Sequence, residues 1–273
     1  MTKIVIFQGT SQSFSCGADV HTLVKMHSEQ PLKDANDFLD GVTQLQYTLG
    51  YQLALMNPIQ VSIWNGFVMG GGAGISINSA LIVATERAIF AVPACKLGMV
   101  PDCGVMHKLS MCRNGVGEYI CLVGTFVKGG DLVKMGLADF FLSEEDLKAK
   151  ITCAFCKLDG KSTITTMRQF FEENCFSMIN RDYNEIEEIK YYFNNKKSVV
   201  EILELLEKDK KYPEFTEKCL KEMRQASPLA LCIAFESLRR SRVSLRDVIT
   251  KDYRILNRLG ISSVIAYVIV LGY

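Results

Sequence analysis

The sequence predicts an α/β fold, with a β/α core over residues 1–142 and an all-helical region over residues 143–273. Three observations support this fold class. Up to about residue 142, short apolar runs of strand length alternate with segments of helical periodicity. Beyond that point the periodic segments are all helical. A triple glycine, Gly70–Gly72, lies between a strand-like run and a helix-like segment inside the core.

The first elements follow from apolar spacing and from residues that stop an element. Lys3–Gln8 has the pattern of a strand, residues 11–19 that of a loop, and Val20–Glu29 that of a short helix. Leu32–Met56 carries apolar residues at helical spacing over its whole length. Asn57-Pro58 ends this helix, because the residue before a proline disfavours helical backbone angles.

The central elements surround the triple glycine. Ile59–Trp64 is predicted to be a strand, and Asn65-Gly66 is a turn signal directly after it. Gly70–Ser76 is predicted to open a helix, since glycine amides at a helix start are suited to holding negative charge. Leu81–Thr85 and Ala88–Val92 are expected to be two short strands joined at residues 86 and 87.

Helices dominate the remainder of the chain. Ser198 fits an N-cap with Glu201 three residues later, and Ser227-Pro228 fits an N-cap followed by proline at the first helical position. The segments with helical spacing are Met106–Leu122, Gly129–Met135, Glu185–Phe193, Ser198–Lys208, Phe215–Gln225, Pro228–Arg239 and Ser244–Asn257.

Composition excludes several classes of function. The chain has 273 residues, 48% hydrophobic and 22% charged, which is typical of a globular protein. Its net charge of +1 gives no field that would attract nucleic acid, so no nucleic-acid partner is expected. The longest apolar run, Ile261–Tyr273, is shorter than the ~20 residues of a membrane span, and no membrane association is expected.

The ten cysteines are scattered and indicate reduced thiols rather than a disulfide framework. Cys153 and Cys156 have the CxxC spacing, but neither a second such pair nor a nearby histidine accompanies them. No metal site is therefore expected.

Two short loops of small residues have the character of backbone-donor sites. Residues 14–19 (FSCGAD) and Gly70–Gly72 each follow a strand-like run and precede a helix. If one amide from each loop pointed at the same carbonyl oxygen, the two would form an oxyanion hole. A tight turn or close helix packing is the alternative explanation for each loop taken alone.

A carboxylate candidate lies beyond these loops. Asp102 follows a proline and could act as an acid or base beside the glycine-lined backbone. Its alternative role is to cap the helix that begins nearby. Cys103 and His107 are four residues apart and could share a helix face as a Cys–His pair, although a packed cysteine and a half-exposed histidine are the simpler interpretation. Cys95 is expected on a strand, facing away from position 94.

Taken together, these motifs resemble the enoyl-CoA hydratase/isomerase (crotonase) superfamily, and within it the 3-hydroxyisobutyryl-CoA hydrolase branch. The resemblance covers roughly residues 3–260. Gly74 stands where hydratases carry a glutamate, and Asp102 follows proline as in the PD motif of the hydrolases. The segments that carry the resemblance are FSCGAD (14–19), NGFVMGGGAGIS (65–76), VATERAIFAVP (83–93), LGMVPDCG (97–104) and LVGTFVKGGDLVKMGLAD (122–139).

The resemblance implies a spiral of ββα units, N-terminally shortened here, and a site for a CoA thioester. The amides of Ala18 and Gly71 would form the oxyanion hole, and Asp102 would be the catalytic carboxyl group. Gln46 and Gly70 would join Gly71 and Asp102 in binding the substrate. No cofactor is implied beyond the CoA of the substrate. A homo-oligomer is possible.

At two positions the sequence departs from the pattern that it resembles. In the hydrolase branch a glutamate follows the proline of the VP motif and acts with the aspartate, whereas this chain has Ala94. An alanine side chain neither accepts a proton nor acts as a nucleophile. Gln46 stands where the branch often presents a glutamate near the substrate.

The resemblance thus implies a short-chain hydroxyacyl-CoA thioesterase of valine catabolism (branched-chain amino acid degradation). Its expected compartment is the mitochondrion, with peroxisome and cytoplasm as alternatives, and no targeting signal is visible in the chain. Ala94 puts the activity in doubt. One alternative is a catalytically impaired homologue that binds acyl-CoA or an active subunit. An enoyl-CoA hydratase or isomerase is a further alternative.

Overall fold

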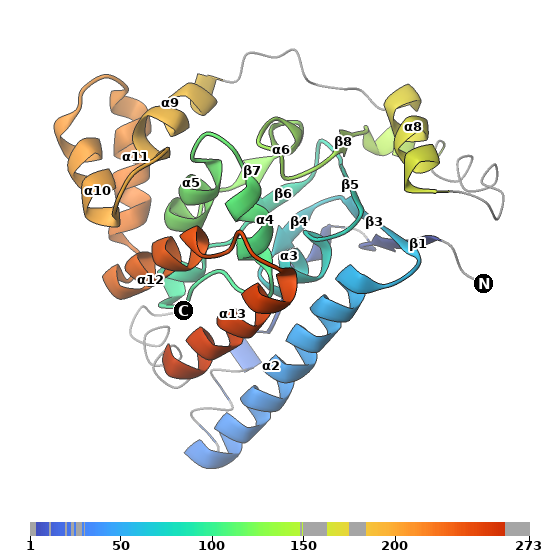
Figure 1. Ribbon diagram of the computed structural model, residues 1–273, viewed down its shortest axis with the longest axis horizontal. Helices are drawn as coiled ribbons and strands as arrows, with labels where there is room; N and C mark the ends of the chain where they lie inside the picture. The colour runs from blue at the N-terminus through green and yellow to red at the C-terminus, as the bar shows by residue number, and fades with distance from the viewer. Residues whose placement is uncertain are drawn as a thin grey trace.

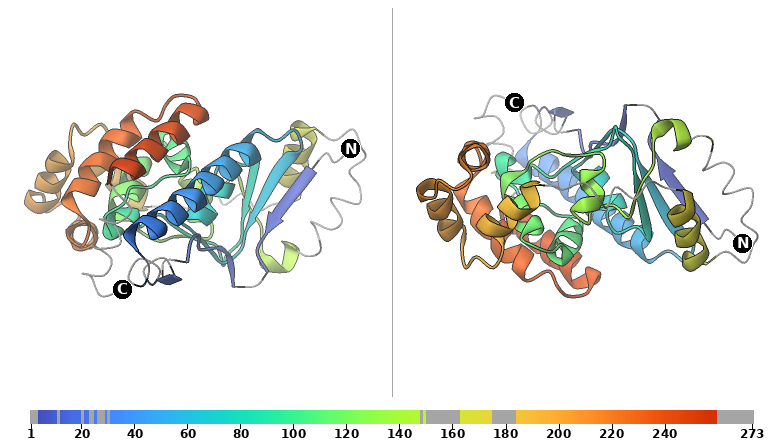
Figure 2. Two further views of the ribbon diagram at one scale, coloured as in Figure 1. Left: turned by 90° about the horizontal axis from the view of Figure 1, so that it is seen from below. Right: turned by 90° about the horizontal axis from the view of Figure 1, so that it is seen from above.

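The computed structural model describes most of the chain, with gaps. The described residues are 4–10, 12–19, 21, 22, 25, 29, 31–147, 149, 163–174 and 184–259. The predicted helix Val20–Glu29 and the Cys153–Cys156 pair lie wholly or largely outside this set. Figures 1 and 2 show the strands on one side of the molecule, the α9–α12 helices on the other, and the long helix α2 along one face.

The first half of the chain repeats a strand–strand–helix unit. The first unit is β1 (Ile4–Gln8), β2 (Ser13–Ser15) and α2 (Leu32–Leu55). The second is β3 (Ile59–Trp64), β4 (Phe67–Met69) and α3 (Gly71–Ser76). The third contains β5 (Leu81–Ala84), β6 (Ile89–Ala91), the 3-10 helix η1 (Ala94–Leu97) and α4 (Val105–Met111).

Each unit contributes one strand to each of two sheets. One sheet has the order β1-β3-β5-β8 and the other β2-β4-β6-β7. All strand pairs are parallel except that of β6 with β7. Since successive units add strands in the same direction, the chain winds as a spiral of ββα units, as the resemblance implies.

Helices fill the second half. After α5 (Val116–Val123), β7 (Val127–Lys128), α6 (Asp131–Lys134) and β8 (Phe140–Phe141), the chain continues through α8 (Ile164–Asn174), α9 (Asn184–Phe193), α10 (Val199–Lys208), α11 (Pro213–Arg224), α12 (Pro228–Arg239) and α13 (Leu245–Leu259). The two predicted caps are confirmed, because Ser198 Oγ accepts from the Glu201 amide and Ser227 Oγ from the Ala230 amide, at 3.1 and 3.3 Å.

Several local predictions are corrected. The predicted loop over residues 11–19 contains the short strand β2. The two predicted strands β5 and β6 are confirmed, and they belong to different sheets. The predicted helix Met106–Leu122 is two helices, α4 and α5, separated by residues 112–115. Gly115 in this break has φ +76°, and a Cβ there would lie 2.5 Å from the Asn194 amide nitrogen of the neighbouring segment. Packing against residues far along the chain therefore divides one continuous helical pattern into two helices.

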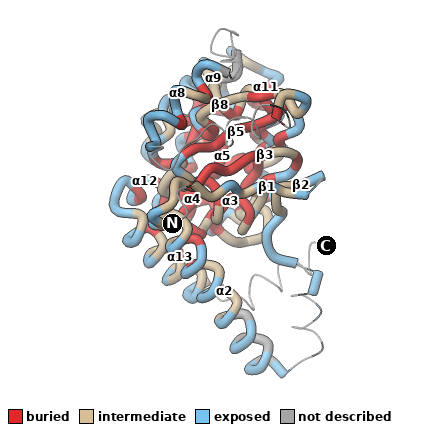
Figure 3. Tube along the Cα trace, turned by 90° about the vertical axis from the view of Figure 1, so that its right-hand side faces the viewer, coloured by how far each residue is buried: buried red, intermediate tan, exposed pale blue. Residues whose placement is uncertain are grey.

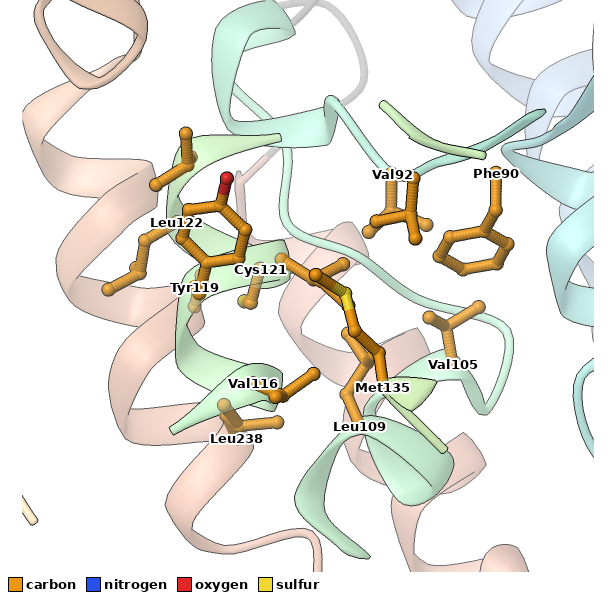
Figure 4. Packing of buried hydrophobic residues seen from close by; sticks show 14 of the residues in the cluster. Phe90, Val92, Val105, Leu109, Val116, Tyr119, Cys121, Leu122, Met135 and Leu238 are labelled. Atoms are coloured by element: carbon orange, nitrogen blue, oxygen red, sulfur yellow. The ribbon is translucent and has the colours of Figure 1, made fainter. Parts of the chain in front are cut away.

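The largest buried cluster joins the two halves of the chain. It extends from Trp64, which stacks on Phe90 with ring centroids 5.3 Å apart, to Val248 on α13. Figure 3 shows the buried segments concentrated around the strands and α5, and Figure 4 shows the packing of Phe90, Tyr119, Met135 and Leu238. The boundary at residue 142 stays a prediction.

The seven described cysteines are all free thiols. Within the described ranges, no helix combines the length and the apolar character needed to cross a bilayer.

Candidate active site

The two loops of small residues meet in space. A Cβ on Gly17 would lie 2.5 Å from the Gly71 amide nitrogen, and one on Gly72 would lie 2.3 Å from the Ser15 carbonyl oxygen. Both positions therefore require glycine, because any side chain would collide with backbone. Of the predicted donors, Ala18 follows in the first loop and is exposed, whereas Gly71 is half-buried.

The conformation of the second loop suits hydrogen-bond donation to a ligand. Gly70 precedes α3 with φ +50°, a left-handed backbone angle that favours glycine. Gly71 is the first residue of α3, and amides in the first turn of a helix have no acceptor within the helix. Neither the Ala18 nor the Gly71 amide donates to another residue in the described part of the chain. Both are therefore available to an oxygen atom of a ligand.

The predicted acid, Asp102, is held by Tyr47 of α2. The Tyr47 hydroxyl donates to Asp102 Oδ2 at 2.7 Å, and the aspartate stays partly exposed. Burial raises the pKa of the Asp102 carboxyl, while hydrogen bonds from Tyr47 and Cys103 offset part of the increase. The Asp102 side chain does not cap α4, because the Gly104 amide at the start of that helix donates to Asp252 instead.

Helix α2 connects the glycine loop to the acid. Gln46, the neighbour of Tyr47, donates from Nε2 to Cys103 Sγ at 3.1 Å. The same Nε2 atom would lie 2.6 Å from a Cβ on Gly71. One turn of α2 thus contacts both predicted halves of the site, so Gln46, Gly70, Gly71 and Asp102 lie close together.

The Cys103 side chain fills the space beside Gly74. It is buried with φ +54°, and a Cβ on Gly74 would lie 2.6 Å from the Cys103 Cβ. Burial raises the pKa of the Cys103 thiol well above its usual range, so it is a neutral thiol rather than a nucleophile. The simpler interpretation of these two residues is confirmed: Cys103 is a packed cysteine that precedes α4 in a left-handed conformation, and His107 on α4 is half-buried.

Ala94 begins η1 and is half-buried. The prediction that Cys95 lies on a strand is wrong, since η1 is a 3-10 helix. Cys95 nevertheless faces the core, where its thiol approaches the Cys121 carbonyl oxygen at 3.6 Å and burial raises its pKa to about 12. It therefore does not replace the absent glutamate. Among the described residues, no group of three or more His, Cys, Asp and Glu side chains is arranged to hold a metal ion.

Sequence reasoning missed three side chains that bind the turn from residue 102 to residue 104, called the acid loop below. They are Tyr47, Asn78 and Asp252. Asn78 Nδ2 donates to the Gly104 carbonyl oxygen at 3.1 Å, and Asp252 Oδ2 accepts from the Gly104 amide at 3.1 Å. A signal for Asp252 was present, because it follows Val248 by four residues on the apolar face of its helix. A lone carboxylate at such a position indicates a buried partner.

Comparison with known proteins identifies the family of this chain. The model of the enoyl-CoA hydratase/isomerase family matches residues 1–263. The chain belongs to this family. The probable 3-hydroxyisobutyryl-CoA hydrolase 3 of Arabidopsis thaliana is 31% identical over 259 residues, covering 93% of this chain and 67% of the relative. The mitochondrial 3-hydroxyisobutyryl-CoA hydrolase of Dictyostelium discoideum is 30% identical, covering 92% and 67%.

Solved structures of this family share the fold. A carnitinyl-CoA dehydratase from Mycobacterium thermoresistibile superimposes with a TM-score of 0.76 at 21% identity, over 92% of this chain and 71% of that one. The enoyl-CoA hydratase/isomerase fold of this chain is thereby established, and with it the predicted fold class. The chain spans about two thirds of the length of the curated relatives named above.

Proposed function

We propose that the protein hydrolyses a short-chain hydroxyacyl-CoA thioester of the 3-hydroxyisobutyryl-CoA type. The observation that supports this most strongly is the connection made by α2, which contacts Gly71 through Gln46 and binds Asp102 through Tyr47. Two amides without an acceptor among the described residues, beside a half-buried carboxyl group, are the groups that acyl transfer to water requires.

The proposed reaction begins with the thioester carbonyl oxygen accepting from the Ala18 and Gly71 amides. The Asp102 carboxylate takes a proton from a water molecule as the water oxygen adds to the carbonyl carbon. The tetrahedral oxyanion then collapses, the carbon–sulfur bond breaks, and the leaving sulfur takes the proton from Asp102. The products are the carboxylic acid and free CoA thiol, and no cofactor takes part besides the CoA of the substrate.

Tyr47 and Gln46 support this chemistry in different ways. The Tyr47 hydroxyl favours the ionised form of Asp102, since it donates to the carboxylate oxygen. Gln46 is placed to contact the substrate near Gly71, together with Gly70. Its amide donates a hydrogen bond but does not remove a proton, so Asp102 is the base in this proposal.

Ala94 favours a second candidate function, that of a catalytically impaired member which binds acyl-CoA or an active subunit. The proposed mechanism has one carboxyl group where the hydrolase pattern implies two, and Ala94 is the position without the acid. In this case the oxyanion loops would retain the thioester without turnover.

Two measurements on the purified protein separate these candidates. Release of free thiol from 3-hydroxyisobutyryl-CoA, followed with a chromogenic thiol reagent, supports the hydrolase; its loss in Asp102→Asn ties it to the site. Tight binding of CoA by calorimetry with no thiol released over hours supports the impaired homologue. Absence of both rejects an acyl-CoA site in this chain.

A hydratase or isomerase is disfavoured by packing. The hydratase pattern needs a carboxylate at position 74, where the Cys103 side chain fills the space. Loss of absorbance from an enoyl-CoA thioester would contradict this reasoning.

The proposed setting is valine breakdown in the mitochondrion, with peroxisome and cytoplasm as alternatives. It is supported by the relative from Dictyostelium that is named a mitochondrial 3-hydroxyisobutyryl-CoA hydrolase. Fractionation of cells that express the full untagged chain, detected with an antibody, tests the compartment, because a C-terminal tag would mask a C-terminal peroxisomal address. Light scattering tests whether the chain forms a homo-oligomer.

A further inference from the structure

Asp252 is a buried acid with an incomplete set of partners. It lies on α13, is fully buried, and its Oδ2 accepts from the Gly104 amide at 3.1 Å. Its other oxygen, Oδ1, is buried without a hydrogen-bond partner among the described residues. Burying a carboxyl group that is only half satisfied is unfavourable, so packing alone does not account for it.

The turn that Asp252 contacts has an unfavourable backbone. Cys103 and Gly104 have φ angles of +54° and +80°, two consecutive left-handed residues directly after Asp102. The left-handed conformation is unfavourable for a residue with a Cβ, so Cys103 needs contacts that hold it there. Side chains bind both backbone polar groups of Gly104: Asp252 accepts from its amide, and Asn78 donates to its carbonyl oxygen.

Helix α13 lies against this turn and against α2. A Cβ on Gly104 would lie 2.9 Å from Leu245 Cδ1 of α13. Tyr253 of α13 makes an edge-to-face contact with Tyr47 of α2, at a centroid distance of 5.9 Å. Figure 1 shows the two helices side by side along the front of the molecule. Asp252 is thus on the element that holds the acid loop and the Tyr47 side chain in one arrangement.

We propose that Asp252 is a positioning residue for Asp102, holding the Gly104 amide and thereby fixing the turn that presents the Asp102 carboxyl. What Asp102 then does to a substrate rests on the function proposed above, whereas the positioning itself does not. Asp252 touches no reacting atom in this scheme.

The charge state of Asp252 makes the proposal measurable. Burial raises the pKa of Asp252 to about 7, the Gly104 amide opposes the increase and the Asp102 carboxylate adds to it. An ionised carboxylate accepts a hydrogen bond more strongly than a neutral carboxyl group, so the Gly104 contact strengthens as pH rises through 7. Five titratable groups interact electrostatically with Asp252. Asp102, Tyr47, Cys103 and Cys121 lie on elements packed against it, and Lys251 lies on its own helix.

The first test observes the contact directly in the full chain. With glycine labelled with ¹⁵N, the Gly104 amide resonance is expected to titrate with a midpoint near pH 7, and the titration is expected to disappear in Asp252→Asn. Val248→Ala is the matched control, because Val248 is fully buried on the same helix without a bond to Gly104. It should weaken the fold yet retain the titration. A Gly104 resonance whose chemical shift and pH dependence are the same in wild type and in Asp252→Asn overturns the proposal.

The second test measures the consequence for turnover, in whichever of the wild type and Ala94→Glu releases thiol. Asp252→Asn is expected to lower kcat by ~10- to 100-fold with KM changed less than about twofold, since misplacing a reacting group acts on the chemical step. An equal loss in Val248→Ala, or a loss confined to KM, contradicts positioning. If neither background turns over, the proposed function fails, and the Gly104 titration alone decides the role of Asp252.

Discussion

The Tyr47 hydroxyl donates a hydrogen bond of 2.7 Å to Asp102 Oδ2, joining a long helix to a loop 55 residues further along the chain. Because Gln46, the next residue on α2, contacts Gly71 and Cys103, this helix sets the spacing between the glycine loop and the acid. The separation of the proposed oxyanion donors from the proposed base therefore depends on how α2 packs rather than on either loop alone.

Replacing Tyr47 with phenylalanine should move the pH dependence of hydrolysis to higher pH. Without the hydroxyl, the ionised form of Asp102 loses a donor, and its pKa, already raised by burial, rises further. A base must be ionised to accept a proton, so the rate at the acidic end of the profile falls. We also expect a stability loss of about 1–3 kcal/mol, measured by urea unfolding, because the Asp102 carboxyl group keeps only the Cys103 thiol as a side-chain donor.

Tyr253→Phe is the matched control for this change. The Tyr253 hydroxyl donates to Asp40 instead, at 2.8 Å, so the pH profile should stay where it is. An unchanged profile in Tyr47→Phe would show that Asp102 is not the base.

Ala94→Glu should increase thiol release from 3-hydroxyisobutyryl-CoA. It restores the carboxyl group that the hydrolase pattern places after the VP motif, and Ala94 is half-buried at the start of η1. A carboxyl group acting in general acid–base catalysis contributes about 10²- to 10⁴-fold. Ala94→Gln, of the same size without the acid, should give no increase. Equal rates in both variants would reject this position as catalytic.

Replacing the two facing glycines, Gly17 and Gly71, with alanine should lower the melting temperature and CoA binding to different extents. At Gly71 a Cβ meets the end of the Gln46 side chain, which is able to rotate away, whereas at Gly17 it meets the Gly71 backbone nitrogen and φ is +84°. Gly17→Ala should therefore lower the melting temperature and CoA binding more than Gly71→Ala. Gln46→Ala should recover the melting temperature of Gly71→Ala but not that of Gly17→Ala, and the reverse order would contradict the contact of the two loops.

Gly74→Ala should destabilise the protein by about 1–3 kcal/mol, because its Cβ would overlap that of Cys103. The overlap should be relieved in the double variant with Cys103→Gly, since glycine also suits φ +54°. Gly41→Ala on α2, where a Cβ meets nothing within 4 Å, is the control and should stabilise slightly. If the losses of unfolding free energy in Gly74→Ala and Cys103→Gly add up in the double variant, measured by denaturant unfolding, the two side chains do not compete for the same space.

Asp252→Asn should change how stability depends on pH. The carboxyl group has a pKa of about 7 in the folded protein and a usual value of 3.8, so the fold favours the protonated form. The stability from this group is complete below about pH 4 and is lost as pH rises to 7. The variant lacks this loss, so its stability relative to wild type should improve between pH 4 and pH 8. A constant difference across that range would show that Asp252 does not titrate with folding.

Local signals in the sequence were sufficient for much of the fold. Apolar spacing and Asn57-Pro58 define α2 and β3 to within a residue or so, and Ser198 and Ser227 fix two helix starts through bonds to nearby amides. These features depend on residues a few positions apart, so the chain determines them by itself. The two-residue strands β7 and β8 carry too little pattern to detect and exist because neighbouring strands pair with them.

The sequence by itself also determined the small residues of the two loops and the presence of a carboxylate after Pro101, since these are matters of residue type. Only the tertiary structure decided which side chains face them. Gln46 against Gly71, Tyr47 on Asp102 and Asp252 on Gly104 join positions that are 25 to 148 residues apart, and no periodicity reports such contacts. They form because α2 and α13 pack beside the turn after Asp102, and that packing is a property of the whole buried core.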